Sequence, residues 1–139
     1  MHKTKHILVA EDSEPDFLLL ERAFKVAGLP HQLTRVRNGT HVIKYLKGEV
    51  PFQNRAISPL PHLLILDDNM PETSGMQLLA FLKEQGNPLP VVMLSGSGHP
   101  GDVQAALSLG AVEYLTKPPS PAELIVLAQT IHHRWLSNR

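Results

Sequence analysis

Residues 63–71 read LLILDDNMP, four apolar residues followed by two aspartates, an asparagine and Met-Pro. The apolar run is short and rich in leucine, and its length favours a buried strand over a helix. The chain therefore ends a buried strand with two adjacent carboxylates, whose like charges oppose each other's ionisation. This arrangement predicts a compensating positive charge close to the end of the strand.

Four further apolar runs share this character, and a segment with helical spacing follows each one. They are HILVA (6–10), HQLTRV (31–36), VVML (91–94) and VEYL (112–115). Strictly alternating strands and helices predict an α/β protein with one doubly wound parallel sheet and helices on both faces.

The first and last helical segments carry apolar stripes that should face the core. The stripes consist of Phe17, Leu20 and Phe24 in the first segment and of Leu124, Leu127, Ala128, Ile131 and Trp135 in the last. Gly28-Leu29-Pro30 predicts the end of the first helix, and Ser120-Pro121 predicts the start of the last.

Length and composition exclude several classes of protein. A chain of 139 residues with 42% hydrophobic residues fits one domain and leaves no room for a second. Thirteen basic and thirteen acidic residues cancel, which argues against nucleic-acid or anionic-membrane binding. There is no cysteine, no apolar stretch long enough for a membrane span and no signal-peptide core, so we expect a cytoplasmic protein.

Polar side chains stand at the ends of four of the predicted strands. In such sheets, ligands bind beyond the carboxyl ends of the strands. Carboxylates from two neighbouring strands suit Mg²⁺, and a hydroxyl and an ammonium from two others would bind a phosphoryl group. The side chains are those of Glu11, Asp12, Asp67, Asp68, Ser95 and Lys117.

Together, these motifs resemble the receiver domain of bacterial two-component response regulators. The resemblance covers nearly the whole chain and rests on ILVAEDSEPD, LDDNMPETSG, VVMLSGSG and YLTKP. It implies a flavodoxin-like fold with five strands in the order 2-1-3-4-5 and five helices. It also implies one receiver domain over residues 1–139 without an output domain, as in the stand-alone chemotaxis regulators.

The resemblance assigns a role to each site residue. Asp67 would be the phosphoacceptor, because it lies three residues before Met70 and four before Pro71, whereas Asp68 lies one place off. Glu11, Asp12 and Asp67 would bind Mg²⁺ together with the backbone carbonyl of Asn69. The remaining roles are those of the phosphoryl-pairing lysine, the switch hydroxyl and the switch aromatic, which fall on Lys117, Ser95 and Tyr114. In the family the bond between this lysine and Pro118 is cis.

The chain departs from the commonest receiver pattern at three positions. Glu11 replaces the frequent aspartate, Ser95 stands where threonine is commonest, and Asp68 replaces an apolar residue. The proline-rich loop over residues 48–61 and the ending IHHRWLSNR resemble the small stand-alone receivers that partner bacterial phytochromes.

The resemblance predicts a signalling protein and not a dedicated enzyme. Its partners would be a sensor histidine kinase or phosphotransfer protein and a downstream protein target, with no nucleic acid and no membrane. A homodimer is left open. It would catalyse only its own phosphorylation and slow dephosphorylation.

Two other functions remain open on the same fold: a phosphorylation-independent binding module and a small enzyme acting on phosphorylated metabolites. Several features also have plain structural interpretations. Glu11 and Asp12 could be solvated acids near a helix N-terminus, Lys117 a surface lysine and Tyr114 a packing residue. Gly96, Gly98 and Gly101 match a dinucleotide-binding pattern, but Pro100 interrupts it. The histidines are scattered, and we assign them no role.

Overall fold

The protein is described by a computed structural model that covers residues 4–67, 70, 74–96 and 100–137. Strands and helices alternate along the chain, as the apolar runs predict. The elements are β1 (His6–Ala10), α1 (Glu14–Val26), β2 (Gln32–Val36), α2 (Gly39–Lys47), β3 (Leu63–Asp67), α3 (Gly75–Glu84), β4 (Val91–Ser95), α4 (Pro100–Ser108), β5 (Glu113–Thr116) and α5 (Pro121–Ile131).

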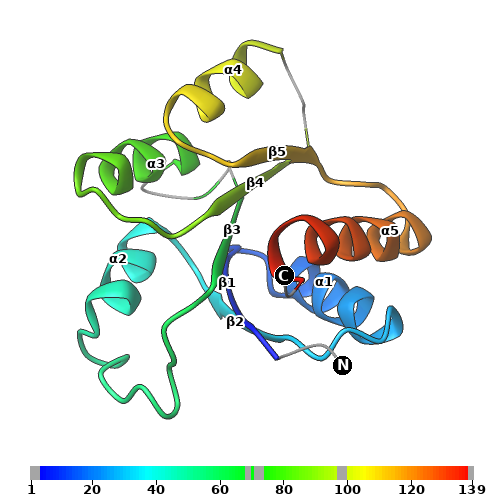
Figure 1. The fold of residues 1–139 in the computed structure, drawn as a ribbon, viewed down its shortest axis with the longest axis horizontal. Helices are drawn as coiled ribbons and strands as arrows, with labels where there is room; N and C mark the ends of the chain where they lie inside the picture. Colours follow the sequence, from blue (N-terminus) through cyan, green and yellow to red (C-terminus); the bar gives the residue numbers. More distant parts are fainter. Residues whose placement is uncertain (1–3, 68–69, 71–73, 97–99, 138–139) are drawn as a thin grey trace.

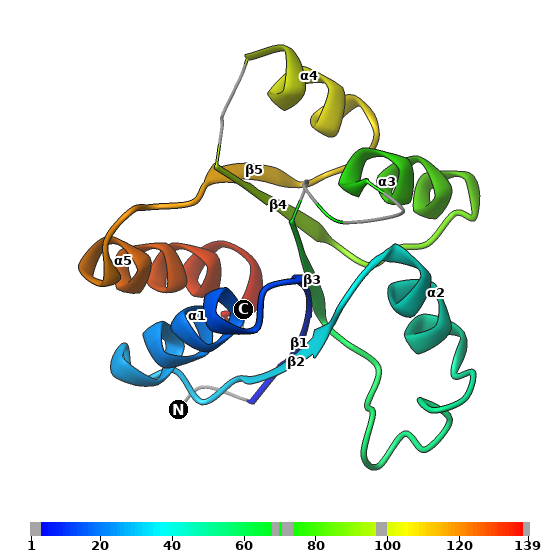
Figure 2. The ribbon, with the colours of Figure 1, turned by 180° about the vertical axis from the view of Figure 1, so that it is seen from behind.

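The five strands form one parallel sheet in the order β2-β1-β3-β4-β5, which confirms the predicted fold class. Helices α1 and α5 cover one face of the sheet, and α2, α3 and α4 cover the other (Figure 1). The view from behind shows the same three layers (Figure 2). All five strands therefore end at the same edge of the sheet.

Alternate residues of each strand face opposite layers, because successive side chains of a strand point to opposite faces. Ile7 and Val9 of β1 pack against α1 and α5, whereas Leu8 and Ala10 pack toward α2 and α3. The predicted stripe of α1 is buried as expected, with Phe17, Leu20 and Phe24 each less than 9% exposed.

The predicted helix ends are also confirmed. Gly28 has a φ of 74°, a backbone conformation that favours glycine, and ends the turn after α1. At the start of α5, the hydroxyl of Ser120 accepts the N–H of Glu123 at 3.2 Å.

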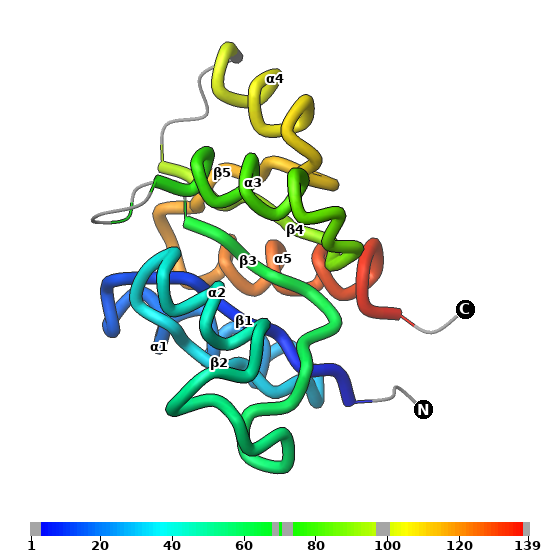
Figure 3. The backbone as a smooth tube through the Cα atoms, turned by 90° about the vertical axis from the view of Figure 1, so that its left-hand side faces the viewer, coloured from blue at the N-terminus to red at the C-terminus, as the bar shows by residue number. Residues whose placement is uncertain are grey.

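The last helix differs from its predicted form. The α-helix ends at Ile131, and a π-helical turn continues from His132 to Leu136. Because a π-helix has more residues per turn, the next buried apolar side chain after Ile131 is that of Leu136 and not that of Trp135. Leu136 is 2% exposed, and Trp135 is only partly buried. The start of β1 and this turn lie at the same end of the molecule (Figure 3).

Two further findings concern the described part of the chain. The peptide bond between Lys117 and Pro118 is trans, so the expected cis bond is wrong, and the cis bond among these residues joins Val50 and Pro51. No helix in the described ranges is both long and apolar enough to cross a membrane.

Candidate functional site

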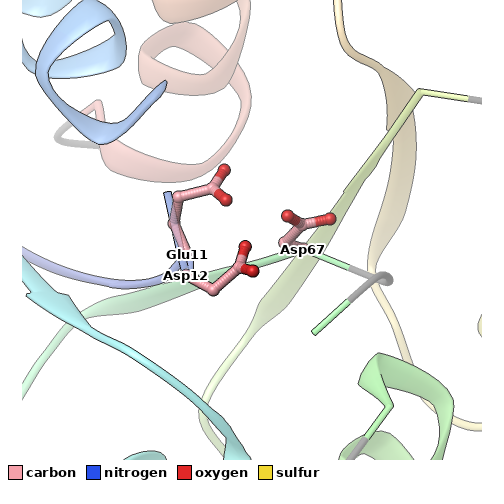
Figure 4. Close-up of side chains that lie close together, drawn as sticks. All are labelled: Glu11, Asp12 and Asp67. Carbon is pink, nitrogen blue, oxygen red and sulfur yellow. The ribbon is translucent and has the colours of Figure 1, made fainter. Parts of the chain in front are cut away.

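Three carboxylates from two neighbouring strands meet at the carboxyl edge of the sheet. Glu11 and Asp12 follow β1, and Asp67 is the last residue of β3. One carboxylate oxygen of each lies within 4.8 Å of one from each of the others. Figure 4 shows the three side chains pointing into the same space. Glu11 and Asp67 are buried, whereas Asp12 is exposed, so the cluster is open to solvent on the Asp12 side.

Lys117 supplies the positive charge that the aspartate pair predicted. Its Nζ atom donates to Oε1 of Glu11 at 2.8 Å and to Oδ2 of Asp67 at 3.3 Å. It also lies 3.6 Å from Oδ2 of Asp16, whose side chain is half exposed. One ammonium therefore contacts carboxylates from β3, from the turn after β1 and from α1.

The shared lysine does not neutralise the whole cluster. Burial raises the pKa of Glu11 from 4.5 to about 7, and the negative charge of Asp67 adds to this rise, against the hydrogen bond from Lys117. Burial lowers the pKa of Lys117, but the hydrogen bond to Glu11 and the charge of Asp67 outweigh this effect and raise it overall. Lys117 therefore stays charged, while Glu11 ionises less readily than an ordinary glutamate.

The turn between β1 and α1 is held at each of its residues. The N–H of Glu11 continues the β1–β2 ladder by donating to the carbonyl of Val36 at 3.0 Å. The N–H of Ser13 donates to Oε2 of Glu11, and its hydroxyl accepts from the N–H of Asp16 as the cap of α1. Glu11 is thus held by the backbone and is buried, which contradicts its interpretation as a solvated acid, whereas Asp12 is exposed.

The two predicted switch residues lie on β4 and β5. Ser95 ends β4 and is 1% exposed, and its carbonyl accepts the N–H of Lys117 at 2.7 Å. Tyr114 is half-buried and packs against the core on the α2–α3–α4 side of the sheet. The end of β4 is therefore linked directly to the lysine of the carboxylate cluster.

Part of the predicted site lies outside the described residues. This applies to Asn69, whose backbone carbonyl was expected at the metal, to Asp68 and to Pro71. It also applies to Gly98 of the glycine pattern, so that pattern gains no structural support.

A cavity of about 270 Å³ opens beside the cluster, between α1 and the segment that leads into α5. Its walls are largely apolar, with Phe17, Leu20 and Leu124 among them, while Glu11 and Asp67 lie at its polar end. The volume falls just below the range of about 300 to 1,000 Å³ that is typical of small-molecule pockets.

The chemistry of the cluster fits a hard divalent cation. Mg²⁺ prefers a few carboxylate oxygens and retains several waters, and the three carboxylates offer such oxygens on a side that solvent reaches through Asp12.

Sequence reasoning missed two contributors. Asp16 lies on the first turn of α1 near Lys117, and Arg35 of β2 donates to the carbonyls of Glu11 and Asp12. Asp16 was visible as a further acid in the EDSEPD stretch. Arg35 was visible as a cation inside an apolar run, but only the β1–β2 register shows what it contacts.

Comparisons with known proteins agree with this geometry. Residues 7–129 match the response regulator receiver domain family. Response regulator Rcp1 of Synechocystis sp. (strain PCC 6803) is 35% identical over 136 residues, which cover 95% of this chain and 89% of Rcp1.

Solved structures give the same result. The crystal structure of response regulator RPA3017 in red light signaling of R. palustris aligns with a TM-score of 0.89 and 30% identity, over 95% of this chain and 94% of that one. The phosphorylated cyanobacterial phytochrome response regulator RcpA aligns with a TM-score of 0.84 and 31% identity, over 97% and 96%. The Mn²⁺-bound form of Rcp1 aligns with a TM-score of 0.81 and 33% identity, over 97% and 96%. The chain belongs to the response regulator receiver domain family.

Proposed function

We propose that Asp67 accepts a phosphoryl group from the phosphohistidine of a sensor histidine kinase or phosphotransfer protein. The observation that carries this proposal is the position of Asp67, whose carboxylate lies beside Lys117 and within 4.8 Å of two further carboxylates at one sheet edge. RcpA, a similar protein, has been crystallised in its phosphorylated form.

The transfer would be a displacement at phosphorus. An oxygen of Asp67 attacks, the P–N bond to the donor histidine breaks, and its electron pair returns to the donor imidazole. Lys117 would stay paired with the transferred group and offset its charge, while the Ser95 hydroxyl would donate to it.

Mg²⁺ is the cation that we propose for Glu11, Asp12, Asp67 and the backbone carbonyl of Asn69. When bound, it would offset the negative charge that the carboxylates and the incoming phosphoryl group bring together. Rcp1, a similar protein, has been crystallised in a Mn²⁺-bound form, which supports the proposal of a divalent cation for this chain.

The donor in signalling would be a protein, although a small phosphodonor can replace it in an assay. Leu18 and Leu19 on α1 and Val126 on α5 are exposed, and Leu19 lines the cavity beside Asp67. Leu19 thus places exposed apolar surface beside the acceptor, which favours contact with another protein.

The signal would leave through Ser95 and Tyr114 to a downstream protein. Hydrogen bonds from Ser95 and Lys117 to the phosphoryl group would draw the end of β4 inward, and Tyr114 would move toward the vacated space. The surface of α4, β5 and α5 would then change, as in other switches that a local charge event biases.

Incubation with acetyl phosphate and Mg²⁺, followed by intact-mass measurement, tests the proposal. The wild type should gain one phosphoryl group, which excess chelator should prevent, and Asp67→Asn should gain none, because the amide is not a nucleophile. The matched control, Asp68→Asn, should be labelled like the wild type. Labelling of Asp67→Asn, or loss of labelling in Asp68→Asn alone, would contradict the assignment. A wild type that stays unlabelled would favour the phosphorylation-independent binding module.

A further inference from the structure

Arg35 lies next to the carboxylate cluster but on a strand that contributes no carboxylate to it. The residue is on β2, in register with Val9 of β1, two residues before Glu11. Its side chain is 16% exposed, so most of this long cation lies against the protein. A buried arginine of this kind normally has a specific set of acceptors.

The guanidinium spans two consecutive carbonyls of the β1–α1 turn. Its Nε atom donates to the carbonyl of Glu11 at 2.9 Å, and its NH2 atom donates to the carbonyl of Asp12 at 2.7 Å. The first distance is ordinary for an N–H···O hydrogen bond and the second is at the short end of the range, and two bonds from one planar fork fix orientation as well as position.

The third contact of Arg35 is weaker. Its NH1 atom lies 3.8 Å from Oε2 of Glu14, whose side chain is 70% exposed. An exposed ion pair of this length contributes little. Arg35 therefore interacts mainly with the backbone of Glu11 and Asp12, whose carboxylates form one side of the cluster.

We propose that Arg35 is a positioning residue for the cation site, because it holds the backbone from which the Glu11 and Asp12 carboxylates project. This inference rests on the proposed function, in which those carboxylates bind Mg²⁺. Asp12 depends most on Arg35, because its side chain is exposed, whereas Glu11 is buried and is also bonded to Val36 and Lys117.

Two physical effects of Arg35 have opposite signs, and this makes the proposal testable. As a charge, the guanidinium repels a cation, so its removal would tighten metal binding. As a positioning group, it preorganises the ligands, so its removal would weaken metal binding. Lysine at this position separates the two effects further, since it retains the charge but cannot bridge both carbonyls in one plane.

The experiment is Mn²⁺ binding, measured by the EPR signal of the free ion, with thermal unfolding in chelator as the check on folding. Arg35→Ala should weaken Mn²⁺ affinity by about 10-fold or more, a loss typical of groups that orient metal ligands, and Arg35→Lys should weaken it less, by several-fold. Excess Mg²⁺ should restore acetyl-phosphate labelling of Arg35→Lys toward the wild-type rate. It would not do so if Arg35 only stabilised the fold or only bound the phosphodonor.

Arg37 provides the matched control. It is exposed and lines the same polar hollow as Asp12, Glu14 and Arg35, so Arg37→Ala removes an equal charge and should leave affinity unchanged or slightly higher. Arg35→Lys with wild-type affinity, or Arg35→Ala with tighter binding, would overturn the inference alone. A wild type that binds no Mn²⁺ would overturn the proposed function and the inference with it.

Discussion

At the carboxyl edge of the sheet, three carboxylates contact one lysine, whereas at the amino edge one carboxylate, that of Glu113, is bonded by two side chains. Trp135 donates from its indole Nε1 to Oε1 of Glu113 at 2.7 Å, and Arg134 pairs with the other oxygen of that carboxylate. Just before β1 and β2, the N–H of Lys5 donates to Nδ1 of His31, whose Nε2 then donates to Nδ1 of His132 at 2.8 Å.

The contacts at the amino edge stabilise the fold, whereas those at the carboxyl edge form the candidate site. At the amino edge, these contacts join the π-helical turn to the first residue of β5 and to the residue before β2. At the carboxyl edge, Glu11 ionises with difficulty because burial and Asp67 oppose its charge. A fold holds such an arrangement only if the rest of the molecule is stable, and the same crowding makes the site attractive to a cation.

Among the variants that test this comparison, Asp12→Ala should have the largest effect on metal affinity. Loss of a metal ligand should lower Mn²⁺ affinity by about 100-fold or more. A group that only orients the ligands typically contributes about 10-fold to 100-fold. Because one of three crowded charges is removed, the melting temperature in chelator should rise by about 2 to 4 °C, or about 1 kcal/mol. Calorimetry and thermal unfolding provide the two measurements.

Glu14→Ala is the control for Asp12→Ala, since it removes an acid of the same region that lies outside the cluster. It should leave Mn²⁺ affinity close to the wild-type value. A melting temperature that falls in Asp12→Ala would mean that the exposed carboxylate stabilises the fold, and the contrast between the edges would then be wrong.

Glu11→Gln should change the free energy of unfolding in chelator without removing a whole side chain, and the change should depend on pH. The folded protein releases the Glu11 proton near pH 7 and the unfolded chain near pH 4.5, so ionisation of Glu11 removes stability as the pH rises through that window. Glutamine is neutral throughout. The variant should therefore match the wild type near about pH 4 and exceed it by at most about 3 kcal/mol near about pH 8. Urea unfolding at both pH values measures this difference, and a difference that is independent of pH would contradict the raised pKa.

At the amino edge, Glu113→Ala should lower the free energy of unfolding by about 1 to 3 kcal/mol, because a partly buried indole donor loses its acceptor. Arg134→Ala is the matched control, since it breaks only a pair whose arginine is 56% exposed, and it should cost less than about 1 kcal/mol. Urea unfolding gives both values. Acetyl-phosphate labelling should stay at the wild-type level in both variants, and its loss would mean that the two edges are coupled.

The sequence predicts some contacts at the two edges and not others, and the difference lies in how far apart the contacting residues are in the sequence. The charged residues that end β1, β3 and β5 are predictable, because a buried apolar run followed by acids or lysine places the side chain at the strand end without further information. The partners Arg35–Glu11 and His31–His132 are not, because they join residues 24 and 101 positions apart through strand register and helix packing. The histidines therefore had no assignable role in the sequence.

The smallest effect should be that of Mg²⁺ on the emission of Trp135. The indole is bonded to Glu113, the first residue of β5, and Lys117 follows the last residue of that strand. Four residues at roughly 3.3 Å each separate the two by about 13 Å along the strand, so a cation at the carboxylates should not alter the surroundings of the indole. We therefore expect Mg²⁺ titration to leave tryptophan emission almost unchanged. A stable phosphoryl mimic should change it only if α5 takes part in a dimer or partner contact. Strong quenching by Mg²⁺ alone, in protein that light scattering shows to be monomeric, would mean that a change at the carboxyl edge reaches the amino edge through β5.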